Sequence, residues 1–356
     1  MLKALLSDDL PRSRFLSALL LAIFVVLALA PFLFGGAQAI NTAAKICVFI
    51  VLVASYDLLL GYTGIVSFAH TMFFGIGGYG VGLALYNLGS SWTAIAVGLV
   101  AALVTGIVLA FVIGLVSLRV RAIFYAMITL AVASAFAILA GQLSSFTGGE
   151  DGRSFRPPEL LRPTTHLVET PVFGTEITGR VAVYYLVFVA ALILFLAGLR
   201  VVNSPFGRVL QAIRENDFRA EALGYNVVYY RTVANCLAAA MAVLSGALYA
   251  LWLRYVGPDT TLSFSIMVDI LLMVVIGGMG TMYGAVLGAT IFILAQNYLQ
   301  KLMGAASQAT ESIPLLSNLI HPDRWLLLLG VLFILSVYFF PTGIVGKLRE
   351  TANVRK

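Results

Sequence analysis

The sequence predicts an all-α polytopic membrane protein, and three observations support this fold class. Of the 356 residues, 61% are hydrophobic and only 11% are charged, whereas about 25% of the residues in a soluble domain are charged. Apolar blocks of about 20 residues, long enough to cross the hydrocarbon core as a helix, recur along the whole chain. Basic residues stand in the short breaks between these blocks, which is typical of topology determinants and argues against nucleic-acid binding.

We expect about ten membrane segments from the apolar windows of helical length. The first block follows basic residues, as in a secretory signal, but its apolar run continues through Phe34. We therefore expect an uncleaved first span. The ten segments lie near residues 15–34, 39–60, 67–88, 93–118, 122–142, 181–199, 232–253, 265–278, 282–299 and 324–340.

The distribution of basic residues predicts that both the N- and the C-terminus lie in the cytoplasm. The chain then forms a single transmembrane domain over residues 1–356, with two longer hydrophilic stretches. Residues 143–180 are expected to form an extracytoplasmic loop and residues 200–231 a cytoplasmic loop. A connection between two helices needs only a few residues, so the cytoplasmic loop must serve a purpose beyond connection.

The cytoplasmic loop is predicted to contain a short amphipathic helix followed by a second, shorter one. Ser204 suits the N-cap position and Pro205 the first helical position, and Gly224 is expected to end the second helix. An apolar stripe lies beside a polar stripe on the first helix. The apolar stripe consists of Phe206, Leu210 and Ile213.

The sequence contains no motif for enzymatic chemistry. The nearest match to a phosphate-binding loop, Gly346 and Lys347, lacks the earlier glycine and the hydroxyl residue that should follow. The three histidines are far apart, and Cys47 and Cys236 lie within apolar stretches, which suggests neither a disulfide framework nor a metal site. We therefore expect a chain that is not an enzyme and binds no metal or cofactor, so that any ATP must be used by partner subunits.

The stretch at residues 61–70 brings glycine and polar groups to membrane depth, and further glycines follow it. Non-helical backbone is tolerated there only where it is buried or lines a wet cavity, which predicts a broken or re-entrant helix beside a transport path. Close helix packing through small residues is the alternative interpretation. The candidate residues for the translocation path are Gly64, Ser67, His70, Gly75 and Gly77. For His70, a hydrogen-bonded structural role is the alternative.

Two acidic residues, Asp57 and Asp269, are further candidates for the translocation path. Both lie within or at the end of a predicted span, and intramembrane acids are costly enough to count as functional candidates. A solvated or helix-capping role near the membrane surface is the alternative. A second glycine series at residues 277–288 is better explained by close packing of two helices.

Seven short motifs occur at intervals along the chain, and together they closely resemble the LivM-type permeases of branched-chain amino-acid ABC importers. The resemblance extends over residues 57–345, most of the chain. The motifs are LLLGYTG at 58–64, FFGIG at 73–77, SPFGR at 204–208, AIRE at 212–215, AEALG at 220–224, SGALY at 245–249 and GGMGT at 277–281.

This resemblance implies a permease subunit of the inner (plasma) membrane that moves branched-chain or related amino acids into the cytoplasm by alternating access. It also implies four kinds of partner: the membrane, a second homologous permease subunit, two ATP-binding subunits and an extracytoplasmic solute-binding protein. Residues 200–231 become the loop that couples ATPase motion to the permease. The coupling residues that it implies are Arg214, Glu215, Asp217, Glu221 and Gly224. A helix that merely rests on the membrane surface is the alternative for this loop.

Three other functions remain open at this point. An ion-coupled secondary transporter is one, because such proteins use unwound helices and intramembrane acids. An ABC permease for urea, other amides or aromatic compounds is the second, because no residue of the sequence discriminates between these substrates. A purely structural membrane anchor for a complex is the third.

Overall fold

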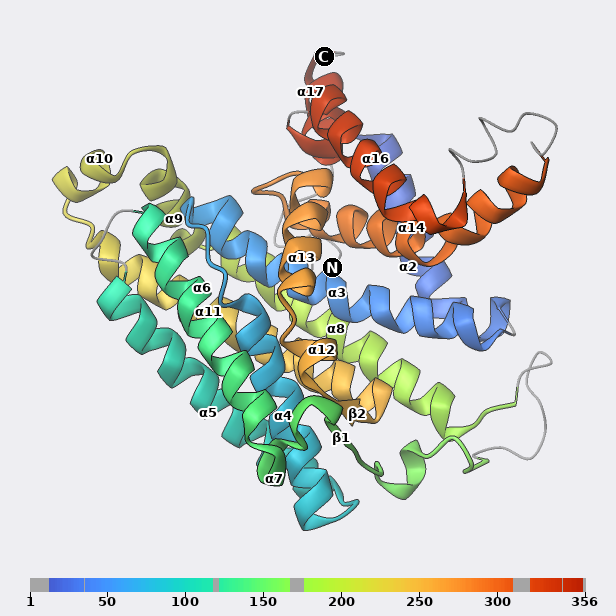
Figure 1. Ribbon diagram of the computed structural model, residues 1–356. Coiled ribbons are helices and arrows are strands. Elements are labelled where there is room, and N and C mark those ends of the chain that lie inside the picture. Colours follow the sequence, from blue (N-terminus) through green and yellow to red (C-terminus); the bar gives the residue numbers. More distant parts are fainter. Residues whose placement is uncertain are drawn as a thin grey trace.

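The computed structural model describes residues 13–34, 36–117, 122–166, 176–309, 321–340 and 342–354 of the chain. Helices account for most of this length (Figure 1). Residues 167–175 of the predicted extracytoplasmic loop lie outside the described residues. The longer helices are α2 (Arg14–Leu33), α3 (Ala37–Thr63), α4 (His70–Leu88), α5 (Trp92–Ser117), α6 (Ala122–Gln142), α8 (Gly179–Asn203), α11 (Val227–Leu253), α13 (Phe264–Gly277), α14 (Met282–Ala309), α16 (Trp325–Phe339) and α17 (Gly343–Val354).

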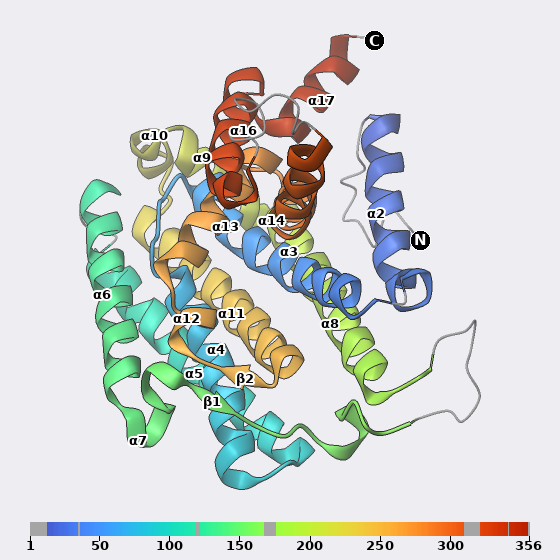
Figure 2. The same cartoon turned by 45° about the vertical axis from the view of Figure 1, so that its right-hand side comes forward.

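Short elements lie between the long helices, several of them at the two ends of the bundle and α12 inside it (Figure 1, Figure 2). They are α7 (Ser144–Thr147), η1 (Gly149–Asp151), β1 (Arg153–Ser154), η2 (Glu159–Leu161), α9 (Pro205–Glu215), α10 (Asp217–Ala222), β2 (Tyr255–Val256), α12 (Pro258–Thr261) and η3 (Pro322–Arg324). Both views place α9 and α10 at one end and β1, β2 and α7 at the opposite end (Figure 1, Figure 2). We refer to these as the α9–α10 end and the β1–β2 end.

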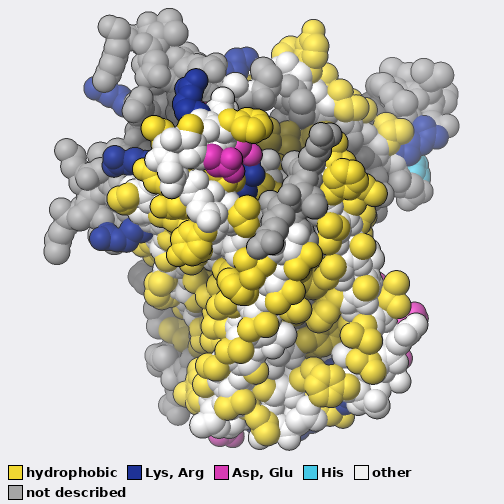
Figure 3. Space-filling model, turned by 90° about the vertical axis from the view of Figure 1, so that its left-hand side faces the viewer, with side chains coloured by type: hydrophobic (Ala, Val, Ile, Leu, Met, Phe, Trp, Pro, Cys, Tyr) yellow, Lys and Arg dark blue, Asp and Glu magenta, His cyan; other side chains and the backbone are white. Residues whose placement is uncertain are grey.

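The described residues contain eight helical segments that are long and apolar enough to cross a membrane. Each of the ten predicted segments coincides with one helix, and only α4 and α16 fall outside this group of eight. Hydrophobic side chains cover the middle of the face shown in Figure 3, while charged side chains gather toward its upper and lower ends. The chain is therefore an all-α polytopic membrane protein, as the sequence predicts.

The centre of the bundle is formed by α3, α4 and α11. From Ile46 to Thr63 nearly every residue of α3 is buried, because apolar or small residues occupy most positions on all sides of this part of the helix. Helices α4 and α11 cross so closely that a Cβ atom added at Gly77 would overlap the carbonyl oxygen of Val243. A Cβ atom at Gly246 would likewise overlap the carbonyl oxygen of Phe74. Glycine is needed at this crossing because it lets the two backbones touch.

The second glycine series brings α13 and α14 together, as its spacing predicts. A Cβ atom at Gly277 would overlap the carbonyl oxygen of Gly284, and one at Gly288 would overlap that of Met273. The two helices therefore form a tight hairpin whose turn lies at residues 278–281.

Two non-helical stretches interrupt the helices inside the bundle. Gly64 ends α3 with a left-handed φ of +73°, and residues 65–69 are non-helical before α4 begins at His70. A second interruption surrounds α12 and precedes α13. The two stretches meet, since the rings of Phe68 and Phe264 lie 6.1 Å apart and Leu262 fills the space beside Gly75. The predicted broken helix is thus present between α3 and α4.

Candidate functional site

Helix α9 begins as the sequence predicts. The hydroxyl oxygen of Ser204 accepts a hydrogen bond from the backbone N–H of Gly207 at 3.4 Å, and Pro205 occupies the first helical position. Leu210 and Ile213 are fully buried, and the ring of Phe206 stacks on Tyr230 of α11 with centroids 5.7 Å apart. The predicted apolar stripe therefore anchors α9 to the ends of the long helices instead of leaving it free at the surface.

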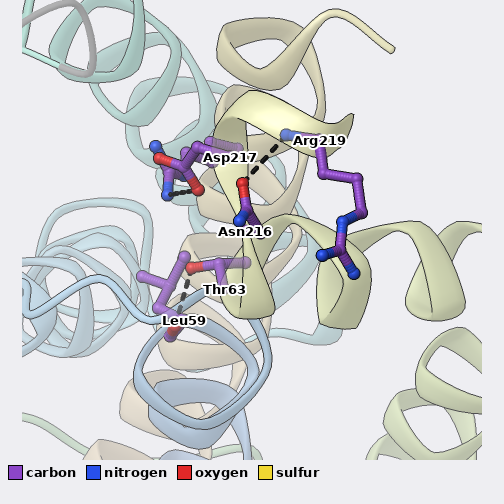
Figure 4. A network of polar contacts seen from close by, with 6 residues as sticks. Leu59, Thr63, Asn216, Asp217 and Arg219 are labelled. Atoms are coloured by element: carbon purple, nitrogen blue, oxygen red, sulfur yellow. Dashed lines mark hydrogen bonds and ion pairs between the residues drawn. The ribbon is translucent and has the colours of Figure 1, made fainter. Parts of the chain in front are cut away.

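Asn216 separates α9 from α10 and caps the second helix. Its backbone is extended, and its side-chain oxygen accepts a hydrogen bond from the N–H of Arg219 at 2.9 Å (Figure 4). Asp217 accepts a hydrogen bond from Arg231 at 2.9 Å, which ties α10 to the start of α11. Gly224, with a left-handed φ of +90°, follows the end of α10 as predicted. The α9–α10 segment is thus a defined structure. It is held by the buried apolar stripe of α9, by the Asn216 cap and by the hydrogen bond between Asp217 and Arg231.

Arg214 connects α9 to the end of α3. Its guanidinium donates a hydrogen bond to the carbonyl oxygen of Gly61. Four residues earlier on α3, the carboxylate of Asp57 accepts a hydrogen bond from the backbone N–H of Gly280 at 2.8 Å. Gly280 stands in the α13–α14 turn with a φ of +77°, and the guanidinium of Arg214 lies beside it. We call the group formed by Asp57, Gly61, Arg214 and Gly280 the Asp57 node.

The Asp57 node can transmit mechanical force. A displacement of α9 must pull on the last turn of α3 through Arg214, and α3 in turn holds the α13–α14 turn through Asp57. The packing around Gly61 leaves no free space, because a Cβ atom there would overlap both the Asp57 carboxylate and the Gly280 nitrogen. Tightly packed contacts of this kind pass displacement on instead of absorbing it.

The other predicted coupling residues differ in exposure. Glu215, Glu221 and Gly224 are exposed, and Asp217 is partly buried in its ion pair with Arg231. The five predicted residues all lie within residues 214–224, and among them Arg214 is the one hydrogen-bonded to the end of α3. Figure 4 draws Asn216 and Asp217 together with the end of α3, where Thr63 donates a hydrogen bond to the carbonyl of Leu59 at 2.7 Å.

The coupling residues that the sequence predicts do not include Phe218 and Leu223. Their side chains are 84% and 72% exposed, although both are large and apolar. They stand in an otherwise polar stretch at the very end of the bundle, next to the exposed Glu215 and Glu221. The signal that could have found them is an apolar residue that falls outside the buried stripe of an amphipathic helix. Large apolar side chains exposed among charged residues make this segment a candidate protein-docking surface.

The predicted path residues near the interruption lie in the interior. His70 is fully buried, and its Nε2 atom is hydrogen-bonded to the hydroxyl of Ser55 at 3.1 Å. The ring of Tyr56 packs against it edge-on at 5.1 Å. Ser67 is buried and its hydroxyl accepts a hydrogen bond from Ala69 N–H at 3.4 Å. These contacts give His70 a hydrogen-bonded place beside the non-helical stretch.

The remaining candidates are dispersed. Gly64 is exposed near Arg214, whereas Gly75 and Gly77 lie at close contacts within the core. Asp269 stands on α13, where it accepts a hydrogen bond from Gln296 of α14 at 3.4 Å. The structure therefore does not bring Asp57 and Asp269 into one site.

Known proteins match this chain over most of its length. The family described as "Branched-chain amino acid transport system / permease component" matches residues 38–337. The permease protein LivM of the high-affinity branched-chain amino acid transport system of Salmonella typhimurium is 25% identical over 94% of this chain and 76% of its own length. The Escherichia coli LivM is 25% identical over 95% of this chain and 77% of its own length.

A second kind of permease protein matches as well. LivH of the same Salmonella typhimurium system is 25% identical over 88% of this chain and 94% of its own length. No solved structure matches the chain. The match over residues 38–337, with likeness to both kinds of permease protein over most of this chain, shows that the chain belongs to the permease family of branched-chain amino acid ABC transporters.

Proposed function

We propose that this chain is one of two homologous permease subunits of an ABC importer in the inner membrane. The existence of both LivM and LivH relatives supports a pair of permeases. The α9–α10 end faces the cytoplasm, where it contacts one of two ATP-binding subunits. The β1–β2 end faces outward, where a solute-binding protein delivers the substrate.

The observation that carries this proposal is the Asp57 node. Arg214 fastens the short helix α9 to α3, and Asp57 fastens α3 to the α13–α14 turn. ATP binding closes the partner ATPases, moves α9 and thereby shifts α3 against the α13–α14 hairpin. Alternating access follows because the two interruptions, which meet at Phe68 and Phe264, are places where helices can change direction.

The substrate class that we propose is the branched-chain amino acids. The support is that the family and the LivM and LivH relatives are described as permeases of branched-chain amino acid transport systems. The translocation path passes the non-helical stretch that carries Ser67 and His70 and continues along α13 toward Asp269.

Uptake by the complete importer in proteoliposomes tests this function. We expect labelled leucine to enter only when ATP and both ATP-binding subunits are present, and we expect collapse of the proton and sodium gradients to leave the rate unchanged. Labelled urea should not enter. Uptake that persists without the ATP-binding subunits and stops when an ion gradient is collapsed would show a secondary transporter instead. Uptake of urea but not leucine would exclude the proposed substrate.

A further inference from the structure

A seam of polar side chains joins α3 to α14. The residue numbers of the partners increase along α3 as they decrease along α14, so the two helices run antiparallel. The two helices lie side by side in both ribbon views (Figure 2). Three hydrogen bonds form the seam: Lys301 to Gln38 at 2.6 Å, Asn297 to Thr42 at 3.3 Å and Lys45 to Gln296 at 2.9 Å. We call these six residues the polar seam.

At one end of the polar seam, the side-chain amide of Gln296 lies between two opposite charges, those of Lys45 and Asp269. The ammonium of Lys45 donates to the side-chain oxygen of Gln296, and the nitrogen of the same amide donates to the carboxylate of Asp269 on α13 at 3.4 Å. Lys45 also lies over the ring of Phe49, 5.4 Å from its centroid. The cation and the carboxylate thus contact the same amide without forming a direct ion pair among the described contacts.

This charge pair lies deep in the membrane-spanning part. Gln296 is 14 residues into the 28-residue helix α14, and hence halfway along it. Lys45 is eight residues beyond Ala37, or about 12 Å along α3. All three side chains are nevertheless partly exposed. Charged groups at this depth are costly against lipid and mark water-filled or substrate pathways.

We propose that Lys45 and Asp269 bind the zwitterionic head of the substrate, with the substrate carboxylate on Lys45 and its ammonium on Asp269. This inference rests on the proposed function. An α-amino acid carries both charges on neighbouring atoms, so it fits between a cation and a carboxylate that are spaced by one amide. With its amide turned by about 180° from the orientation in the structure, which presents the oxygen to Lys45 and the nitrogen to Asp269, Gln296 can then donate to the substrate carboxylate and accept from its ammonium. Ile266 and Leu272, three residues before and after Asp269, are partly exposed and lie on the same face of α13, where they offer apolar surface to a branched side chain.

The same helices connect this subsite to the Asp57 node. Lys45 and Asp57 are 12 residues apart on α3, or about 18 Å, while Asp269 and Gln296 stand on the two helices of the hairpin whose turn Asp57 holds. A shift of α3 against the α13–α14 hairpin therefore changes the separation of Lys45 from Asp269. The subsite binds tightly in one arrangement and releases the amino acid in the other.

The test is leucine uptake by the reconstituted importer carrying Lys45→Gln and Asp269→Asn together. These substitutions remove both charges but keep groups that hydrogen-bond to Gln296. We expect the importer to assemble and uptake to fall at least about 30-fold, because each charge makes a buried ionic contact with the substrate. Lys301→Gln, at the other end of the polar seam, is the matched control and should leave uptake unchanged.

If the polar seam only holds α3 and α14 together, the opposite result is expected. In that case the double variant transports leucine with wild-type rate and KM, which overturns the subsite. Gln296→Ala gives a second criterion if the double variant fails to assemble. This substitution removes both hydrogen bonds of Gln296 but leaves the charges of Lys45 and Asp269. The proposed subsite therefore predicts uptake within about tenfold of wild type, and loss of assembly would overturn the proposal. If the wild-type importer takes up no leucine at all, the proposed function fails, independently of either variant.

Discussion

Replacing Phe218 and Leu223 together by serine is expected to abolish association with the ATP-binding subunit and ATP-driven uptake. Both side chains are mostly exposed, so their loss costs the folded permease little. In a docked complex, each acts as a buried apolar anchor worth about 2 kcal/mol, and losing both weakens association on the order of 10³-fold. Co-purification of the ATP-binding subunits with the tagged permease measures this directly.

Leu160→Ser is the matched control for this variant. Leu160 is also apolar and 54% exposed, but it lies in η2 at the β1–β2 end, so association should be unchanged. Deleting residues 214–224 should abolish both uptake and association, because the deletion also removes Arg214 from the Asp57 node, while membrane insertion remains intact. Normal uptake after the deletion, or wild-type association of the serine variant, would contradict the proposed role of α9 and α10.

Gly77→Ala is expected to destabilise the permease by about 3 kcal/mol, at the upper end of the range for overpacking. The added Cβ atom would overlap the carbonyl oxygen of Val243 on α11, and a backbone atom cannot move aside as a flexible side chain does. The crossing of α4 and α11 must therefore open. Thermal unfolding of the purified protein, followed by size-exclusion chromatography, should show a midpoint lower by roughly 5–10 °C.

Gly330→Ala provides the same substitution where there is room. Gly330 is also helical, in α16, and a Cβ atom there meets nothing within 4 Å. Alanine is favoured over glycine in a helix by up to about 1 kcal/mol, so the midpoint should stay the same or rise. Equal stability of the two variants would mean that the α4–α11 crossing is looser than described.

The membrane segments and the short helices of the coupling loop could be predicted because their signals are local. Apolar length predicts the spans, Ser204 and Pro205 predict the start of α9, and Gly224 predicts the end of α10. The interruption at residues 64–69 could also be predicted, because glycine and polar groups at membrane depth indicate non-helical backbone. Each of these features depends on residues that are neighbours in the sequence.

The contacts that give the segments a function could not be predicted, because they join residues far apart in the chain. Arg214 and Gly61 are 153 residues apart, and Lys45 and Gln296 are 251 residues apart. Nothing local distinguishes Lys45 from a lysine that reaches the membrane surface, and its role becomes visible only once α3 packs against α14. The pairing of β1 with β2 and the position of α12 depend in the same way on how distant helices meet.

The side of the membrane on which the end of α9 lies is the most direct test of ATP-driven coupling through the α9–α10 segment. Glu215→Cys, in a variant with Cys47 and Cys236 replaced by alanine, can be treated with a membrane-impermeant maleimide. We expect no labelling in intact spheroplasts, labelling in inside-out vesicles, and protection when the ATP-binding subunits are bound. Leu160→Cys in the same background should show the reverse sidedness. Labelling of Glu215→Cys from outside the cell would contradict a cytoplasmic contact with an ATPase.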